Sequence, residues 1–176
     1  LAEQNVLRFS PHVNPQSPLI GLEPSAILSF RYEYPRLVGE SLREKARNIA
    51  QHTYMLEEFL QREAEAGRIG PEDFPSVKRH ILLHGHCHQK AVGKVAASAF
   101  VLSLPEGHSV QTLPTGCCGM AGSFGYEKEH YAISQKIGEL VLFPALREAP
   151  EEWMVAAPGT SCRHQIEEGV GRKAWH

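Results

Sequence analysis

The stretch Arg79-His80-Ile81-Leu82-Leu83-His84, followed at once by Gly85-His86-Cys87-His88, decides how this chain folds. Its apolar centre has the length and composition of a buried strand. A helix is expected soon afterwards, over 91–104. A strand that leads through a short loop into a helix is the first half of a β-α-β unit, and the loop carries a cysteine flanked by histidines.

The same order of strand and helix recurs on both sides of this stretch. Such alternation predicts an α/β fold of small parallel sheets covered by helices, built from Rossmann-like β-α-β units. The other expected strands cover 18–22, 109–113 and 153–157, and the other expected helices cover 26–30, 41–66, 127–148 (kinked or divided near Pro144) and 163–168.

The helix expected over 41–66 rests on apolar residues that step by three and four. Ser41 and Glu44 have the spacing of a capping box at its start. Gly67 and the Gly70-Pro71 pair are expected to end it.

The cysteines follow the expected strands. Cys87 comes after the strand over 79–84, the vicinal pair Cys117-Cys118 after the strand over 109–113, and Cys162 after the strand over 153–157. The carboxyl ends of parallel strands share one edge of a sheet, where α/β proteins bind ligands. We therefore expect three loops to bring four thiols to one place.

Composition narrows the classes of function. The 176 residues, 42% of them hydrophobic, suffice for a compact core, and the formal charge of -2 gives no basic field for nucleic acid or anionic lipid. We expect no membrane span, a cytoplasmic location and, because the chain begins with Leu1, a piece of a longer protein.

The vicinal pair Cys117-Cys118 favours an iron–sulfur cluster over a single zinc ion. A cluster offers several irons to adjacent thiolates, whereas one tetrahedral ion uses adjacent cysteines awkwardly. Gly116 and Gly119 permit the sharp turn that both thiolates need. Two weaker interpretations are that the cysteines are small core residues and that 116–125, expected to open a helix, is a phosphate-binding loop, although it lacks the P-loop lysine.

Histidines surround the thiols. His84, His86 and His88 alternate around Cys87, and His164 follows Cys162. His86, His88 and His164 are retained as possible additional metal ligands; the alternative for each is a structural histidine bonded to the backbone. Nearby Lys90 and Arg163 are expected to offset the charge of an anionic cluster.

A weak internal repeat is also present. The segment 20–26 resembles 156–162: each is an apolar strand that continues through a Pro-containing turn and a Ser toward a helix. Ala26 stands where the second copy has Cys162.

Together these motifs resemble the cysteine-rich CCG domain of the heterodisulfide reductase B subunit and of the iron–sulfur parts of glycolate, lactate and glycerol-3-phosphate dehydrogenases. The likeness covers about residues 6 to 176. The stretches 83–91, 118–126 and 159–165 are most similar to the C-terminal region of fused flavin and iron–sulfur oxidases of the D-2-hydroxyglutarate or D-lactate dehydrogenase type.

The resemblance implies an electron-transfer domain, not catalytic alone, that binds a [4Fe-4S]-type cluster through Cys87, Cys117, Cys118 and Cys162. It would pass electrons between FAD, held by a flavin domain of the same longer protein or by a partner subunit, and an acceptor, while the flavin oxidises a 2-hydroxy acid. The alternative is a structural zinc module without an electron-transfer role. Residues 1–40 would end a first repeat, 41–78 form a long helix and linker, and 79–176 form a complete second repeat.

Two positions depart from the family pattern. Gly159 holds the first place of the closing Cys-x-x-Cys, and Ala26 holds the place of the preceding repeat's closing cysteine. A five-thiolate cluster would lack one ligand, so a histidine or another ligand fills in, or a four-thiolate cluster or zinc is bound. A cysteine at position 159 is expected to complete the set.

Overall fold

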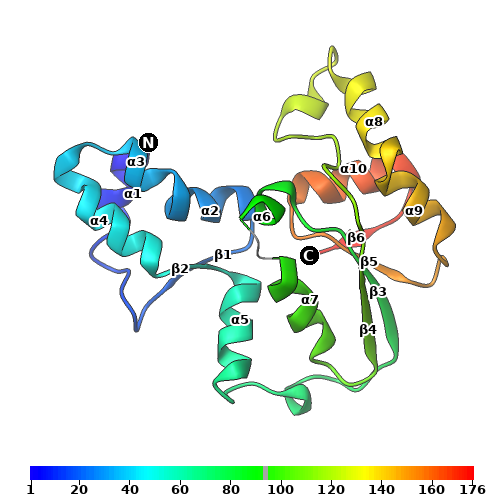
Figure 1. The fold of residues 1–176 in the computed structure, drawn as a ribbon, viewed down its shortest axis with the longest axis horizontal. Helices are drawn as coiled ribbons and strands as arrows, with labels where there is room; N and C mark the ends of the chain where they lie inside the picture. The colour runs from blue at the N-terminus through cyan, green and yellow to red at the C-terminus, as the bar shows by residue number, and fades with distance from the viewer. Residues whose placement is uncertain (93–94) are drawn as a thin grey trace. The chain divides into compact units, whose positions relative to one another are not determined.

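The computed structural model describes residues 1–92 and 95–176. These residues form two compact units, Leu1–Leu60 and Gln61–His176. Each unit has its own small parallel sheet with helices packed against it, so the predicted α/β class is confirmed (Figure 1). None of the described helices is long and apolar enough to cross a bilayer.

The first unit is mainly helical. Val6, Val13, Val38, Ala46 and Ile49 form one cluster of its buried core. Its two strands pair in parallel, with Leu19 opposite Thr53. Its elements are α1 (Ala2–Phe9), β1 (Leu19–Gly21), α2 (Pro24–Tyr32), α3 (Tyr34–Leu37), α4 (Glu40–Gln51), β2 (Thr53–Met55) and the start of α5 (Leu56–Glu65).

The prediction of one long helix over 41–66 is wrong. Strand β2 separates α4 from α5 because β-branched Thr53 and its neighbours pair with β1, and the Leu19 N–H donates to the His52 carbonyl (2.8 Å). Pairing with a distant strand overrides the local helical period here. The prediction that Ser41 and Glu44 form a capping box is also wrong, since α4 begins at Glu40 and its N-cap is Gly39.

The second unit contains a four-stranded parallel sheet in the order β4-β3-β5-β6. If these four strands are numbered 1 to 4 as they follow one another along the chain, their order across the sheet is 2-1-3-4. The chain therefore runs in one direction across the sheet from β3 to β4 and in the other direction from β3 to β5. In open α/β sheets, ligands bind beyond the carboxyl ends of the strands at such a switch point. The strands are β3 (Arg79–Leu83), β4 (His108–Thr112), β5 (Met154–Ala156) and β6 (Ala174–Trp175).

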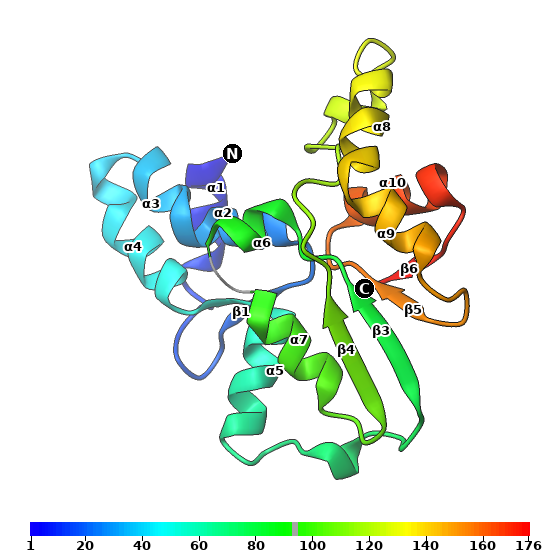
Figure 2. The same ribbon diagram turned by 45° about the vertical axis from the view of Figure 1, so that its right-hand side comes forward.

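Helices cover both faces of this sheet (Figures 1 and 2). Ile81 and Leu83 pack toward α7, whereas Leu82 packs toward α9 and α10, as the period of two along a strand requires. The helices are α6 (Cys87–Ala91), α7 (Val95–Ser103), α8 (Tyr131–Leu140), α9 (Leu142–Glu148) and α10 (Thr160–Val170), with short 3-10 helices at Pro71–Asp73 and Phe124–Tyr126.

All four expected strands are present, within one residue of the predicted bounds at either end. The helix expected over 127–148 is divided, as predicted, but at Val141. Pro144 is the third residue of α9, where its missing N–H disturbs no helical hydrogen bond. Of the helix expected over 91–104, residues 93 and 94 lie outside the described residues.

The expectation that the Cys117-Cys118 segment opens a helix is wrong. Both cysteines lie in a loop, and α8 begins only at Tyr131. Gly119, Ala121 and Gly122 have φ values of 107°, 41° and 71°. These left-handed conformations cannot belong to a right-handed helix, and they turn the chain sharply beside the cysteines.

The internal repeat has a structural counterpart. Ala26 is the third residue of α2, which follows β1, and Cys162 is the third residue of α10, which follows β5. The N-cap of each helix is extended. The two segments thus share the same strand–turn–helix geometry.

Candidate metal centre

Three loops bring the four cysteines to the carboxyl edge of the second unit's sheet. Cys87 is the first residue of α6 after β3, Cys117 and Cys118 lie in the loop after β4, and Cys162 lies in the first turn of α10 after β5. Cys118 and Cys162 are buried in the core between the sheet and α9 and α10. Cys87 is exposed, and Cys117 is intermediate. The set therefore extends from the core to the surface.

The thiols contact one another in a continuous series. The thiol of Cys87 lies beside that of Cys117, Cys117 beside Cys118, and Cys118 beside Cys162, close enough for each pair to shift each other's pKa. The imidazole of His84 lies beside Cys162 and favours its thiolate form. Four sulfur atoms and one ring nitrogen thus form an extended row of metal-binding atoms.

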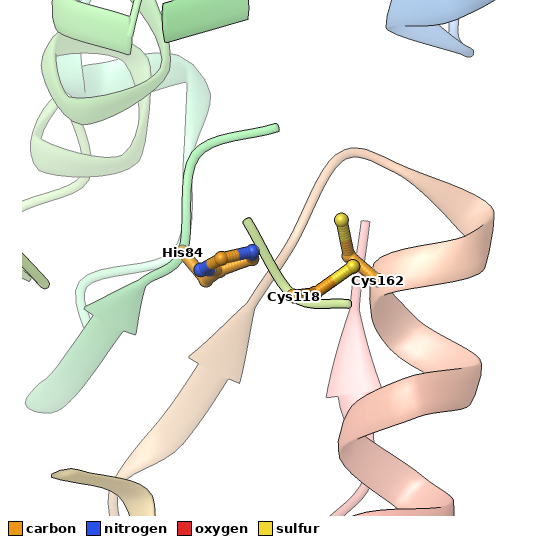
Figure 3. A group of neighbouring side chains, drawn as sticks. All are labelled: His84, Cys118 and Cys162. Atoms are coloured by element: carbon orange, nitrogen blue, oxygen red, sulfur yellow. The ribbon is translucent and has the colours of Figure 1, made fainter. Parts of the chain in front are cut away.

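The inner end of this row is compact. The ligand atoms of His84, Cys118 and Cys162 all lie within 4.8 Å of one another, and all three residues are buried. Figure 3 shows the imidazole reaching from the end of β3 toward the two thiols, one on the loop and one on α10. Cys87 and Cys117 are not members of this compact group.

The thiols differ in their readiness to ionise. A hydrogen bond from Cys118, helped by His84, lowers the pKa of Cys162 to about 5 against the effect of burial. Hydrogen bonds from Cys118 and Cys87 lower the pKa of Cys117 as well. The donors Cys87 and Cys118 have raised pKa values. Ionising all four thiols together therefore requires a cation that takes the place of these protons.

Lys90 anchors the start of the cysteine loop. Its Nζ donates to the carbonyls of Thr115 (2.6 Å) and Gly116 (2.7 Å), directly before Cys117. Burial lowers the pKa of Lys90, and the neighbouring thiols oppose that shift. The ammonium thus holds the loop and places positive charge beside the cysteines, as expected from the sequence.

Buried polar contacts hold the far side of the loop. Gln165 Nε2 donates to the Cys118 carbonyl (3.0 Å) and to the Ser134 carbonyl (3.1 Å), and Gln165 is fully buried. The Gly119 N–H points at Cys117 Sγ (3.3 Å). Backbone donors of this kind stabilise negative charge on a ligating sulfur.

The histidines retained from the sequence have other contacts. His86 caps α6: its Nδ1 accepts from the His88 N–H (3.2 Å), and its own N–H donates to Gln89 Oε1. His88 is partly exposed, and exposed His164 bonds through Nδ1 to the hydroxyl of Tyr126 (2.5 Å). None of these three belongs to the compact group.

His84, weighed with His86 and His88 around Cys87, is not among the candidate ligands retained from the sequence, although a signal for it was available. His84 continues the β3 ladder, its N–H donating to the Ala156 carbonyl (2.9 Å). Two residues earlier, Leu82 packs on the face that holds Cys118 and Cys162. The strand period of two therefore directs His84 to the same face as those thiols.

The chain has relatives among dehydrogenases. It is 26% identical over 159 residues to a subunit of the anaerobic glycerol-3-phosphate dehydrogenase of Escherichia coli K12, a match that covers 90% of this chain and 38% of that protein. It is 29% identical over 157 residues to D-2-hydroxyglutarate dehydrogenase of the same organism, a match that covers 88% of this chain and 14% of that protein. The corresponding enzyme of Pantoea ananatis is 26% identical over 160 residues, covering 90% and 15%.

The chain thus spans less than two fifths of the length of each of these relatives. No family model matches the sequence. No solved structure matches it either. The similarity is to parts of oxidoreductases, and the buried group of one histidine and two cysteines is compatible with a metal centre of such an enzyme.

Proposed function

We propose that this chain is the iron–sulfur electron-transfer domain of a flavin-dependent 2-hydroxy acid oxidoreductase, with a [4Fe-4S]-type cluster bound by Cys87, Cys117, Cys118 and Cys162. The catalytic site for the hydroxy acid lies outside the chain. The domain receives electrons from FAD, held by a flavin domain of the same longer protein or by a partner subunit, and passes them to an acceptor.

The extended row of thiols is the observation that carries this proposal. Ligands of a single tetrahedral zinc ion lie roughly 3.5 to 4 Å apart, each with every other, because metal–sulfur bonds are about 2.3 Å long. In this row Cys87 reaches Cys118 through Cys117, and neither Cys87 nor Cys117 belongs to the compact group. Several irons joined by sulfide accommodate such a row better than one ion does.

When bound, a cluster of this kind takes up and gives back single electrons. The chain's own residues prepare its surroundings. Lys90 fixes the loop and offsets negative charge, and the Gly119 N–H faces the sulfur of Cys117. Leu113, Met120 and Leu142 keep water from Cys118 and Cys162. The exposed thiol of Cys87 leaves one side open toward a redox partner.

The relatives support the assignment to a larger oxidoreductase. One is named as a subunit of glycerol-3-phosphate dehydrogenase, and the others are named as D-2-hydroxyglutarate dehydrogenases. This chain corresponds to a minor share of each, which leaves room elsewhere for the flavin and the substrate. The free thiols suit a reducing compartment and support a cytoplasmic location.

The repeat geometry supports the proposed domain organisation. With Ala26 and Cys162 at equivalent helix positions, residues 1–40 correspond to the end of a first repeat and 79–176 to a complete second one. Residues 41–78 connect them, as two helices with a strand between. Only the second repeat then holds a full set of thiols.

Anaerobic reconstitution of the full chain with iron and sulfide tests the proposal. We expect a brown protein with several irons and matching sulfide per chain, and an electron paramagnetic resonance signal on reduction or oxidation. Isolation in air without iron would carry little weight, because exposed clusters oxidise and thiolates then bind whichever cation is available. Failure of anaerobic reconstitution would contradict the proposal.

A structural zinc module is the second candidate, and the compact group favours it. His84, Cys118 and Cys162 offer three zinc ligands, and Cys117 adjoins them. Colourless protein with one zinc per chain that persists after anaerobic treatment with iron and sulfide would support this candidate. Cys87→Ser separates the two, since it removes a cluster ligand and leaves the compact group intact.

A further inference from the structure

His84 presents an unpaired ring nitrogen to the thiols. Its side chain is fully buried, and Nε2 is shielded from solvent without a hydrogen-bond partner among the described residues. A buried polar atom left unpaired costs about 1 to 3 kcal/mol, so such atoms are rare without a reason. Here the atom belongs to a residue of the compact group with Cys118 and Cys162.

The other ring nitrogen is held in place. His84 Nδ1 lies 2.7 Å from the hydroxyl of buried Thr115. Lys90 Nζ contacts the same hydroxyl (3.2 Å) and the Thr115 carbonyl, so the partner of His84 is itself anchored. A histidine that binds metal through one nitrogen commonly donates the other N–H to a fixed acceptor. Donation from Nδ1 leaves a lone pair on Nε2.

The backbone and neighbouring side chains also fix where the imidazole can lie. The His84 N–H donates to the carbonyl of Ala156, which ties it to β5. A metal ion about 2.0 to 2.1 Å from nitrogen and 2.3 Å from sulfur fits among three atoms that lie within 4.8 Å of one another. Side-chain adjustment from within that 4.8 Å to the roughly 3.5 to 4 Å spacing of tetrahedral ligands would bring all three atoms onto such an ion.

We propose that His84 Nε2 binds the metal centre directly, as its one nitrogen ligand beside the cysteine thiolates. The inference deepens the proposed function and rests on a metal being bound at this site. As a fifth ligand beside the four thiolates, a neutral imidazole leaves a bound cluster less negative than a fifth thiolate would, which raises its reduction potential.

Pulsed electron paramagnetic resonance of the anaerobically reconstituted full chain tests this inference. With 14N-histidine, we expect a nitrogen coupling to the cluster that changes to the 15N pattern when histidine is labelled. The coupling should disappear in His84→Cys and persist in His86→Asn, His88→Gln and His164→Gln. His84→Cys should also lower the reduction potential. Absence of coupling in an iron-loaded wild type, or its persistence in His84→Cys, would overturn the proposal.

Cobalt(II) alone provides a second measurement that needs no cluster and so separates this inference from the proposed function. If His84 is a ligand, His84→Ala should weaken cobalt binding by at least about tenfold, whereas His164→Gln should leave it unchanged. If the wild type binds cobalt but no iron–sulfur cluster, the proposed function is wrong. The comparison of cobalt affinities between the wild type and His84→Ala still decides whether His84 is a ligand. Equal cobalt affinities of the wild type and His84→Ala would overturn the proposal.

Discussion

The imidazole of His86 fills the space beside the α carbon of Gly159. A Cβ built on Gly159 would lie 2.4 Å from His86 Cδ2 and 3.2 Å from Cys162 Sγ. The φ of Gly159 is -76°, which any residue adopts. A side chain at position 159 would therefore point toward the thiols, and His86, not the backbone, stands in its way.

This relationship refines the expectation that a cysteine at 159 completes the ligand set. Gly159→Cys alone should destabilise the loop by about 1 to 3 kcal/mol, because the His86 ring must move. The double variant His86→Ala with Gly159→Cys should bind more iron, or give a changed cluster spectrum, compared with His86→Ala. Iron analysis and absorption spectra after anaerobic reconstitution provide the measurement. Identical spectra for the double and single variants would show that position 159 does not reach the metal.

The four thiols should act as one site. Each of the four substitutions of Cys87, Cys117, Cys118 or Cys162 by Ser should remove most of the bound iron, because each one removes a ligand of the same centre. His52→Gln and His108→Gln serve as controls, since these histidines bond to backbone carbonyls of Asn48 and Leu102. Full iron content in Cys118→Ser would refute a shared site.

Gly119 should be indispensable to the cysteine loop for a packing reason. A Cβ there would lie 2.2 Å from the Ser134 carbonyl oxygen, whereas a Cβ on Gly122 meets nothing within 4 Å, although both residues have positive φ. Gly119→Ala should therefore cost about 1 to 3 kcal/mol more than Gly122→Ala. Urea unfolding of the metal-free chain measures the difference; equal losses of unfolding free energy would contradict the packing argument.

Lys90→Met should loosen the loop and weaken metal binding. The substitution keeps the aliphatic stem but leaves the carbonyls of Thr115 and Gly116 without their charged donor. Loss of these hydrogen bonds should lower the free energy of unfolding by about 2 kcal/mol. The exposed Lys136 offers a matched control, for which Lys136→Met should stay within about 0.5 kcal/mol of the wild type. If Lys90→Met leaves the free energy of unfolding unchanged, the loop holds its shape without the ammonium.

Thr115→Val should show whether the Thr115 hydroxyl orients the His84 imidazole or whether Thr115 serves only to fill space. Valine keeps the shape of threonine but removes the oxygen that lies 2.7 Å from His84 Nδ1. Cobalt affinity should fall roughly 10- to 100-fold, and Thr115→Ser should restore much of it. If Val and Ser variants bind cobalt equally well, the hydroxyl does not orient the imidazole.

The sequence predicts the convergence of the cysteines because that convergence follows from a general rule. Once strands over 79–84, 109–113 and 153–157 are recognised, parallel pairing places the residues after them at one edge. The exposed edge strand β6 and the short β2 escape prediction, since two or three residues show no periodicity and exist as strands only through their partners.

The shape of the cysteine loop could not be read from the sequence in the same way. The left-handed conformation of Ala121 is rare for a residue with a Cβ, and the sequence around it gives no pattern that predicts it. Likewise, the contact between His86 and Gly159 joins residues more than 70 positions apart. The orientation of His84, by contrast, follows from strand alternation with Leu82.

Native mass spectrometry of the anaerobically reconstituted full chain tests the central claim most directly, because it counts iron and sulfide on the intact protein. A cluster held by Cys87, Cys117, Cys118 and Cys162 predicts one bound species with several irons and inorganic sulfide, which Cys87→Ser loses. A single zinc or iron ion without sulfide, bound equally by the wild type and Cys87→Ser, would contradict it.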